Sequence, residues 1–378
     1  MKFKISLPDA INKIYEAFKI NNKKLYVVGG SVRDALLDMV PKDFDLATDA
    51  TPEEVENILK NSNIKSFPKG ESFGVISAMI EGEEYEIATF REESYEGGDG
   101  RRPTSVKFSD IIGDVKRRDL TLNALYYDIK EEKIIDLVGG IDDIKNKRIK
   151  PVGSSFDRFR EDKLRVLRAI RFSNRFGSDL DSETQKAIHE FKELEGVSNE
   201  RIRDEFLKGL KSSVNPEKFL SDYKNFFLFK RMFGNLKLDF NFIPEEKDPI
   251  IVISKMLLHN NPEDVFKSLT NLTASSTEKD NIKFLHNLYK RFVDFDKNSF
   301  FPETDGIWID GLAKQRDINN INDKVKTWSK INKLDQNIVN IFLIYKPQYS
   351  AKDFPEITGV CLGKAIKAKN AEYFFNSL

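Results

Sequence analysis

The stretch LYVVGGSVRDALLDMVPKDFDLATDATPEEV, residues 25–55, contains the local signals that decide the fold of the N-terminal part of this chain. The apolar run LYVV is stopped by Gly29 and Gly30, which predicts a strand followed by a tight turn. The spacing of SVRDALLDM predicts a helix that ends near Pro41, because proline cannot continue the hydrogen-bond ladder. DFDLAT then reads as a second strand, so this stretch predicts an α/β arrangement.

The flanking sequence extends this pattern. Residues 9–20, DAINKIYEAFKI, repeat apolar positions at intervals of three and four, which predicts a helix before the first strand. In TPEEVENILKN, Thr51 and Glu54 form the pattern of a capping box, with Pro52 at the first helical position. Residues 73–90, FGVISAMIEGEEYEIATF, read as two strands about the turn EGEE. We therefore expect an antiparallel hairpin to complete a small mixed sheet.

Composition limits the class of protein. A chain of 378 residues exceeds the usual size of one core, so we expect two or more domains. The formal net charge is zero, so a polyanionic partner would have to be bound by local basic clusters. The single Cys361 and three histidines offer neither a disulfide framework nor a Cys/His metal site. No run approaches the roughly 18 apolar residues of a membrane span, and the N-terminus has no signal-peptide core, so we expect a cytoplasmic protein without a membrane partner.

Two aspartates of the predicted second strand suggest a metal site. Asp43 and Asp45 alternate with Phe44 and Leu46, so we expect both carboxylates on one face. Oxygen ligands at this spacing suit Mg²⁺, and two such ions about 4 Å apart could stabilise the attacking and leaving oxygens of a phosphoryl-type displacement. A pair of surface residues beside a turn is the alternative, and the glycine turn upstream favours the functional interpretation.

That glycine turn is suited to phosphate. Gly29 and Gly30 let a triphosphate approach the backbone closely, and a helix starting at Ser31 offers free N–H groups and the positive end of its dipole. Arg33 could reach the same anion. Taken alone, the glycines could equally form an ordinary strand-to-helix turn.

GGSVRD followed by KDFDLAT resembles the signature of the class II tRNA nucleotidyltransferase and bacterial poly(A) polymerase family. Later segments are similar to the family's motifs and occur in the family's order. They are KRRDLTLNALYYD (116–128), similar to the ribose-binding segment; DLVGGIDDIKNKRIKPVG (136–153), similar to the hinge between head and neck; REDKLRVLRAIRF (160–172), similar to the base-selecting E-D-x-x-R pattern; and NERIRDEF (199–206), similar to the motif after it. The resemblance covers roughly residues 25–210.

The ribose-binding segment contains Arg118, Asp119 and Asn123, a mixture able to hydrogen-bond a ribose and neutralise phosphate. An exposed Arg-Asp pair before a buried helix is the alternative. The resemblance assigns Arg118 to the incoming nucleotide. Residues 91–106, REESYEGGDGRRPTSV, are polar and glycine-rich, and they resemble the flexible loop that helps CCA-adding members pass from C to A addition.

The base-selecting segment is predicted to be one helix, with Asp162, Arg165 and Arg168 spaced at three along a polar row. Cytosine and adenine both present an amino donor beside a ring-nitrogen acceptor, so a carboxylate and a guanidinium would select these two bases together. Asp162 and Arg165 are such a pair. The alternative is a surface i,i+4 ion pair between Glu161 and Arg165. The resemblance extends the site to Arg168 and Arg171.

The C-terminal half shows helical spacing from about Pro216 onward, and its phenylalanines are most simply core residues. The fold class expected is α+β, with an N-terminal nucleotidyltransferase palm, a mixed β-sheet with helices, followed by all-helical neck, body and tail domains. The division implied is a palm or head domain at 1–150, a neck for base recognition at 151–215, a body at 216–295 and an RNA-binding tail at 296–378. The glycine-proline stretch of the family's tail is absent here.

The resemblance implies a CCA-adding tRNA nucleotidyltransferase that uses Mg²⁺, CTP and ATP and binds the 3′ end and acceptor arm of tRNA. A poly(A) polymerase and a CC-adding or A-adding specialist remain alternatives. A non-catalytic RNA-binding module would predict loss of the aspartates, yet both are present. A nucleotidyltransferase acting on a small molecule would explain the palm residues but not EDKLR. The sequence does not indicate the oligomeric state.

Overall fold

The computed structural model describes every residue except 1, 71–73, 96–103, 242–244, 294 and 296–306. The chain forms two compact units. The first unit is Met1–Val214 with Asn225–Leu228, and the second is Asn215–Lys224 with Phe229–Leu378. The finer division into head, neck, body and tail stays a prediction. Among the described residues, no helix has the length and apolar character needed to cross a membrane.

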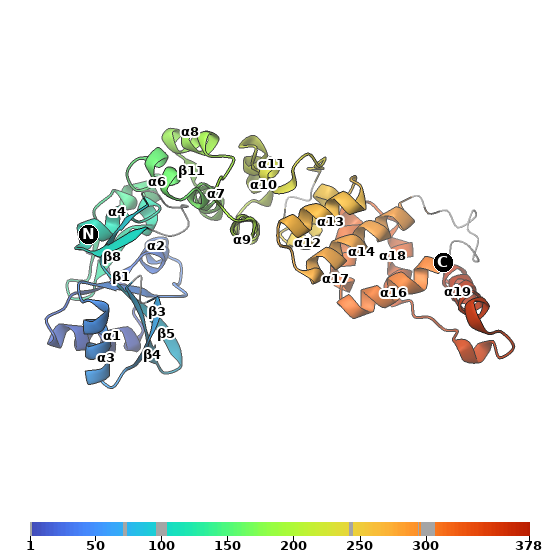
Figure 1. Ribbon diagram of the computed structural model, residues 1–378, viewed down its shortest axis with the longest axis horizontal. Helices are drawn as coiled ribbons and strands as arrows, with labels where there is room; N and C mark the ends of the chain where they lie inside the picture. The colour runs from blue at the N-terminus through green and yellow to red at the C-terminus, as the bar shows by residue number, and fades with distance from the viewer. Residues whose placement is uncertain (1, 71–73, 96–103, 242–244, 294, 296–306) are drawn as a thin grey trace. The chain divides into compact units, whose positions relative to one another are not determined.

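A seven-stranded mixed sheet forms the centre of the N-terminal part of the first unit (Figure 1). Its strand order is β3-β4-β5-β2-β1-β8-β9, and β2 and β5 are its parallel pair. The strands are β1 (Leu25–Val28), β2 (Asp45–Thr48), β3 (Lys65–Gly70), β4 (Val75–Ile80), β5 (Glu83–Thr89), β8 (Leu125–Asp128) and β9 (Lys133–Asp136). The predicted hairpin is β4 and β5, joined at Glu81 and Gly82, which both have positive φ. The predicted mixed sheet is thus confirmed.

Helices cover the sheet because its two faces are both apolar. Helices α1 (Asp9–Ile20) and α3 (Pro52–Asn61) pack against the face that presents Val27, Leu46 and Ile87. The opposite face presents Val28 and Ala47, which pack with Phe90 and Tyr126. Neighbouring residues of β1 and β2 therefore enter different cores, as strand geometry requires. The predicted capping box of α3, between Thr51 and Glu54, is present.

Helix α2 (Gly30–Leu36) follows β1 and is shorter at its C-terminal end than predicted. It stops before Pro41 because Asp38 adopts a left-handed conformation with φ of 55°. The remaining short elements of this part are α4 (Ile111–Lys116), the 3₁₀ turn η2 (Thr121–Asn123) and α5 (Gly140–Lys145). Two small two-stranded sheets pair β6 (Arg91–Ser94) with β7 (Ser105–Phe108) and β10 (Arg148–Ile149) with β11 (Asp179–Leu180).

The first unit ends in helices α6 (Ser155–Glu161), α7 (Leu164–Phe176), α8 (Ser182–Glu190) and α9 (Asn199–Ser212). The prediction of one continuous helix through residues 160–172 is wrong. Asp162 has extended backbone angles, and its side chain accepts a hydrogen bond from the backbone N–H of Leu164 at 3.0 Å. A short carboxylate at this position competes with the helical ladder and starts a new helix, as it does at helix N-termini.

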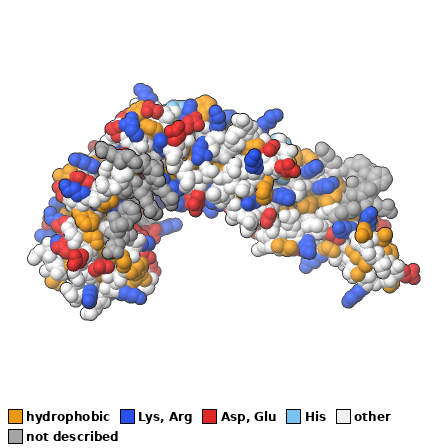
Figure 2. All heavy atoms as spheres, in the orientation of Figure 1, with side chains coloured by type: hydrophobic (Ala, Val, Ile, Leu, Met, Phe, Trp, Pro, Cys, Tyr) orange, Lys and Arg blue, Asp and Glu red, His pale blue; other side chains and the backbone are white. Residues whose placement is uncertain are grey.

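The second unit is helical in its described part, as predicted. Its helices are α10 (Pro216–Asn225), α11 (Leu228–Phe233), α12 (Pro249–Leu257), α13 (Pro262–Asn271), α14 (Ser276–Phe292), α16 (Ile307–Asn319), α17 (Asn322–Ile331), α18 (Gln336–Ile344) and α19 (Gly359–Asn376). Phe219, Phe284 and Phe342 are fully buried, which confirms the core interpretation for these phenylalanines. Figure 2 shows basic and acidic side chains interspersed over the visible face.

Candidate nucleotide-binding site

One cavity of about 400 Å³ in the first unit collects residues from the glycine turn, the second strand, the ribose-binding segment and the base-selecting segment. These segments are far apart in the sequence, and the sheet and α7 bring them together. The lining residues are Gly29, Gly30, Arg33, Asp45, Glu93, Arg117, Arg118, Asp119, Asn123, Asp162, Arg165, Arg168 and Phe172. Guanidinium groups and carboxylates dominate this lining, which suits a charged, polar ligand.

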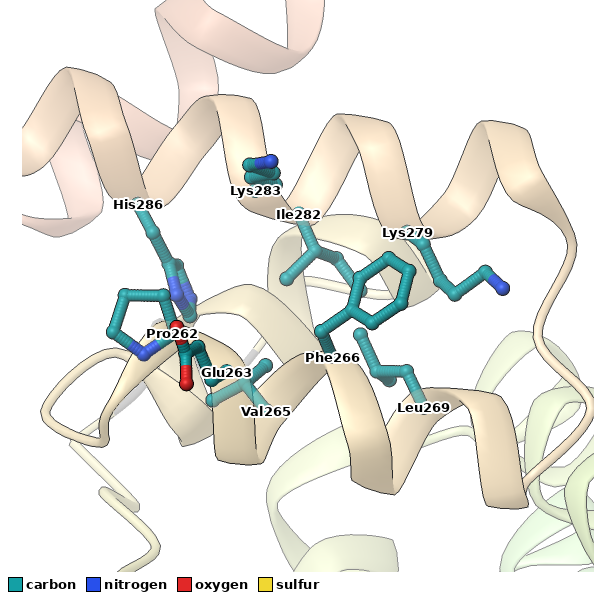
Figure 3. A pocket seen from close by; sticks show the side chains of 9 residues that line it. All are labelled: Pro262, Glu263, Val265, Phe266, Leu269, Lys279, Ile282, Lys283 and His286. Carbon is teal, nitrogen blue, oxygen red and sulfur yellow. The ribbon is translucent and has the colours of Figure 1, made fainter.

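A pocket of about 310 Å³ in the second unit has a different character (Figure 3). It lies between α13 and α14, and Val265, Leu269 and Ile282 form its apolar walls. Phe266 stands between the two helices, while the side chain of Lys279 extends away from the pocket. Glu263 is the carboxylate of its lining. This pocket lacks the paired carboxylates and guanidiniums of the first cavity, so we place the candidate site in the first unit.

The glycine turn has the geometry expected for close approach of a ligand. Gly29 has φ of 74° and ψ of −125°, a conformation that side-chain-bearing residues rarely adopt. A Cβ atom on Gly30 would lie 3.4 Å from Nη2 of Arg33. Helix α2 begins at Gly30, one residue earlier than predicted. Ser31 is buried and its hydroxyl donates to the carbonyl of Val28 at 3.3 Å, so its side chain faces away from the cavity.

The two aspartates are placed differently from each other. Asp45 is the first residue of β2 and borders the cavity, whereas Asp43 precedes the strand. The ladder stops at the pair Val28 and Asp45, because β1 ends there in the glycine turn and leaves Asp43 without a partner strand. The expectation that both aspartates lie on one strand is therefore wrong. Phe44 packs on the core, as predicted.

The environment of Asp45 favours a cation. Loss of solvent raises the pKa of the Asp45 carboxyl, and the negative charges of Glu86 and Asp43 raise this pKa further. Glu86 neighbours Asp45 on the parallel strand β5, and its Oε1 lies 2.7 Å from Nζ of Lys69. Within the described ranges, no three acidic, histidine or cysteine side chains form a metal-binding group by themselves. One or two carboxylates completed by substrate phosphates is the usual protein coordination of Mg²⁺, so Asp43 and Asp45 fit this ion.

Arg118 is held by two residues that the sequence interpretation did not include. Its Nε donates to the hydroxyl of Tyr126 at 2.9 Å, and its Nη2 donates to Oδ2 of Asp114 at 3.0 Å. The guanidinium also lies 4.8 Å from the centroid of the Tyr126 ring. These contacts fix Arg118 beside Gly29, whose hypothetical Cβ would lie 3.6 Å from Nη1.

Asp119 and Asn123 serve as connectors within the site. Asp119 accepts hydrogen bonds from Nε of Arg168 at 2.7 Å and from the side-chain amide of Asn123 at 3.2 Å. Burial opposes ionisation of Asp119, but Arg168 outweighs it and lowers the pKa of this carboxyl. The Oδ1 atom of Asn123 accepts a hydrogen bond from Arg33, which is also paired with Asp34 at 2.6 Å. Arg33 is thus a buried, fully bonded wall of the cavity.

The base-selecting residues Asp162 and Arg165 both line the cavity, but each is bonded to other groups. Nη1 of Arg165 donates to Glu161 at 2.6 Å, and Nη2 donates to the carbonyl of Arg117 at 3.2 Å. Oδ2 of Asp162 accepts from Nη2 of Arg201 at 2.9 Å. The i,i+4 pair of Glu161 and Arg165 therefore forms, but Arg165 is only 7% exposed, so it is not a surface pair.

Helix α9 contributes residues that the sequence interpretation did not single out. Arg201 reaches Asp162, and Glu205 accepts from Nε of Arg171 at 2.6 Å. Arg171 therefore joins α7 to α9 and does not line the cavity. Both α9 residues lie in the quoted segment NERIRDEF, but nothing in its local pattern indicates which of its charges face α7.

The polar loop predicted at residues 91–106 falls partly on 96–103, outside the described residues. Its described ends contact the site. Glu93 pairs with Arg91 at 2.7 Å and with Arg117 at 3.4 Å, and its carboxylate accepts from the hydroxyl of Tyr95 at 2.8 Å. The guanidinium of Arg165 lies 5.7 Å from the centroid of the Tyr95 ring.

Comparison with protein families finds two matches in the first 238 residues. Residues 25–150 match the family described as "Poly A polymerase head domain". Residues 177–238 match the one described as "Probable RNA and SrmB-binding site of polymerase A".

Several curated proteins named CCA-adding enzyme are similar in sequence. The protein from Staphylococcus saprophyticus is 34% identical over 297 residues, which cover 78% of this chain and 72% of that protein. The protein from Lactobacillus helveticus is 42% identical over 208 residues, and that from Bacillus licheniformis is 46% identical over 192 residues. These two matches cover 53% and 50% of this chain, and they span about half the length of each relative.

Solved structures share the fold. The Bacillus stearothermophilus CCA-adding enzyme in complex with CTP aligns with a TM-score of 0.69 at 22% identity, over 97% of this chain and 92% of that chain. The Thermotoga maritima CCA-adding enzyme complexed with tRNA aligns with a TM-score of 0.70 at 19% identity, over 98% of this chain and 92% of that chain.

Proposed function

This chain belongs to the family of CCA-adding enzymes, and we propose that it is a CCA tRNA nucleotidyltransferase. The reaction is template-independent addition of C, C and A to the 3′ end of tRNA from CTP and ATP, with release of pyrophosphate. The observation that carries this proposal is the cavity in which the glycine turn, Asp45, Arg118 and the pair Asp162 and Arg165 meet. Such a cavity offers separate groups for phosphates, ribose and base.

The reaction proposed is in-line attack of the primer 3′-hydroxyl on the α-phosphate of the bound nucleotide. Asp43 and Asp45 would hold Mg²⁺, which, when bound, lowers the pKa of the hydroxyl and neutralises the leaving pyrophosphate. Gly29 lets the triphosphate approach the backbone, and Arg118 presents a fixed positive charge beside this turn. Because Asp114 and Tyr126 already orient Arg118, little side-chain freedom is lost when the nucleotide binds.

Asp162 and Arg165 are the proposed readers of the base edge. A carboxylate has about four lone-pair sites, so Asp162 can accept the amino group of C or A while it keeps its bonds to Arg201 and Leu164. Arg165 has five N–H groups, and three of its hydrogen bonds go to protein atoms, which leaves donors for the ring nitrogen. Uracil and guanine would leave these groups unpaired, which gives strong discrimination.

Arg33, Asp119, Asn123 and Arg168 would frame the ribose and phosphates, with Asp119 orienting Arg168. Gly30 and Ser31 would contribute backbone N–H groups. Arg171 is assigned a supporting role, because it pairs with Glu205 outside the cavity lining.

We assign RNA binding to the helical part of the chain, supported by the match of residues 177–238 to an RNA-binding region of a polymerase family. The proposed division remains a head at 1–150, a neck at 151–215, a body at 216–295 and a tail at 296–378. The partner proposed is the 3′ end and acceptor arm of tRNA. We place the reaction in the cytoplasm, where tRNA, CTP and ATP are available.

A poly(A) polymerase is the second candidate, because the family matches carry that polymerase's name. The zero net charge argues against an enzyme that must hold many different RNA ends. A CC-adding or A-adding specialist would use the same cavity.

The test uses a tRNA transcript that ends at the discriminator base, incubated with Mg²⁺ and with CTP and ATP separately and together, followed by sequencing of the products. Addition of CCA that then stops is the expected result. A product that ends at CC would indicate a CC-adding specialist, and a long A tract would indicate a poly(A) polymerase. A single A added only to a transcript that ends in CC would indicate an A-adding enzyme.

A further inference from the structure

A second cavity of about 320 Å³ lies in the first unit and combines an apolar floor with a basic rim. Leu122, Phe176 and Val214 are among the apolar residues that line it, and Val214 is 64% exposed. The rim carries side chains from α5, the turn after it, β10 and the end of α7. These basic residues are Lys145, Lys147, Arg148 and Arg175.

The rim has an excess of positive charge. Arg148 pairs with Asp143 at 2.6 Å, and Arg175 lies 3.6 Å from Asp34. No carboxylate of the described residues forms an ion pair with Lys145 or Lys147, and both lysines are exposed. Two positive charges at the mouth of this cavity are therefore available to an anion.

The second cavity is separated from the nucleotide-binding cavity by a defined wall. Arg33 lines both cavities, and its guanidinium lies 5.3 Å from the ring centroid of Phe172 and 4.9 Å from that of Phe176. The two rings stack on each other with centroids 5.9 Å apart. A ligand in the second cavity would contact the face of this wall opposite to the incoming nucleotide.

We propose that this second cavity binds one nucleotide unit of the RNA substrate, with its phosphate at Lys145 and Lys147 and its ribose or base on the apolar floor. The inference rests on the proposed function. An isolated inorganic anion would not use the floor, whereas a nucleotide presents phosphate and an apolar ring together. Ser178 and Val214 line the cavity and belong to residues 177–238, to which RNA binding is assigned above. Exposed lysines on flexible stems suit a backbone phosphate held at one point of a larger polyanion.

The experiment compares the parent chain with two variants, Lys145→Gln/Lys147→Gln and Val214→Glu. Lys60→Gln is the control, because Lys60 is an exposed lysine of α3 that does not line this cavity. Binding of a fluorescent tRNA acceptor minihelix is measured by anisotropy between about 0.05 and 0.2 M salt, the range in which phosphate contacts are most visible. Thermal unfolding and the KM for CTP are measured for each variant.

The double variant is expected to bind the minihelix about fivefold to tenfold more weakly at about 0.1 M salt, with a salt dependence shallower by about one to two contacts. Val214→Glu is expected to weaken binding similarly, because it places a negative charge at the rim. The KM for CTP and the unfolding temperature should stay at the parent values. Affinity and salt slope equal to those of Lys60→Gln in both variants would overturn the proposal.

A separate arm tests a free nucleotide as the source of the phosphate. AMP is titrated calorimetrically into the parent chain and the double variant, each with its nucleotide cavity saturated by CTP. Loss of AMP binding in the double variant, together with unchanged minihelix binding, would overturn the assignment to RNA. Because both arms measure binding alone, a parent chain that binds the minihelix but adds no nucleotide would refute the proposed activity and not this site.

Discussion

Substitution of Arg201 by glutamine should weaken base selection without touching the reacting atoms. In the structure, Nη2 of Arg201 donates to Oδ2 of Asp162 at 2.9 Å, across 39 residues of sequence. The other oxygen of Asp162 accepts the N–H of Leu164, so these two bonds together hold the carboxylate at the cavity. Arg201→Gln shortens the side chain and removes its charge, so Asp162 keeps one of its two anchors.

The magnitude follows from the burial of the pair. A hydrogen bond between charged groups contributes about 1.5–3 kcal/mol. The side chains of Arg201 and Asp162 are 23% and 16% exposed, and solvent screening reduces this figure to about 1–2 kcal/mol. If the loss falls on the transition state for transfer, kcat/KM for CTP and ATP should fall by roughly 5- to 30-fold, since about 1.4 kcal/mol corresponds to tenfold. Discrimination against UTP should fall by a similar factor, because the loosened carboxylate rejects a carbonyl less strongly.

The assay is single-nucleotide extension of a tRNA transcript under steady-state conditions, with CTP, ATP and UTP in parallel. Lys208→Gln, at an exposed position of the same helix, is the matched control. Thermal unfolding shows whether α9 remains packed on α7. If Arg201→Gln keeps the kcat/KM for CTP and the CTP-to-UTP ratio of Lys208→Gln while the fold is intact, the Arg201 contact does not position Asp162 and the reasoning fails.

Three further substitutions test the rest of the site. Asp45→Asn should abolish extension while tRNA binding stays within about twofold. Because folding raises the pKa of Asp45 above its unfolded value, the ionised carboxylate costs stability once the pH exceeds that unfolded value, so this variant should also unfold at a higher temperature than the parent at pH 7 in EDTA; measurable turnover, or a lower unfolding temperature, would contradict the assignment. Arg165→Ala should relax base choice in the same extension assay, and strict use of C and A by a folded Arg165→Ala variant would remove the pairing model. Gly29→Ala should lower the free energy of unfolding in urea by about 1–3 kcal/mol, because φ of 74° is strained for alanine, and an unchanged urea midpoint would refute the requirement for glycine.

Local sequence signals predicted most of the first unit correctly. The capping box of Thr51 and Glu54, the hairpin turn at Glu81 and Gly82, and the strands on either side of the glycine turn all depend on neighbours within a few residues. Helix and strand periodicity also report which side chains enter a core, as the opposite burial of Val27 and Val28 shows. Such features can be predicted because the interacting groups are close in the chain.

The errors occur where a distant part of the chain decides the local conformation. The period of EDKLRVLRAIRF does not reveal the break at Asp162, because Arg201 from another helix stabilises the extended carboxylate. Asp43 fails to join β2 because β1 turns away at Gly29, fifteen residues before β2 begins at position 45 if counted from Gly30. The inward orientation of Ser31 likewise depends on its bond to the carbonyl of Val28 at the end of the neighbouring strand.

The sequence by itself determined the chemical groups of the site and the elements that carry them: a glycine turn, an acidic pair and an arginine-rich helix. Only the tertiary structure decided how these groups are used. Arg33 bonds to Asn123 across 90 residues, Arg168 bonds to Asp119 across 49, and Arg171 pairs with Glu205 instead of lining the cavity. Charged side chains with long stems can pair with any of several partners, and burial selects among these partners only when the helices and the sheet have packed.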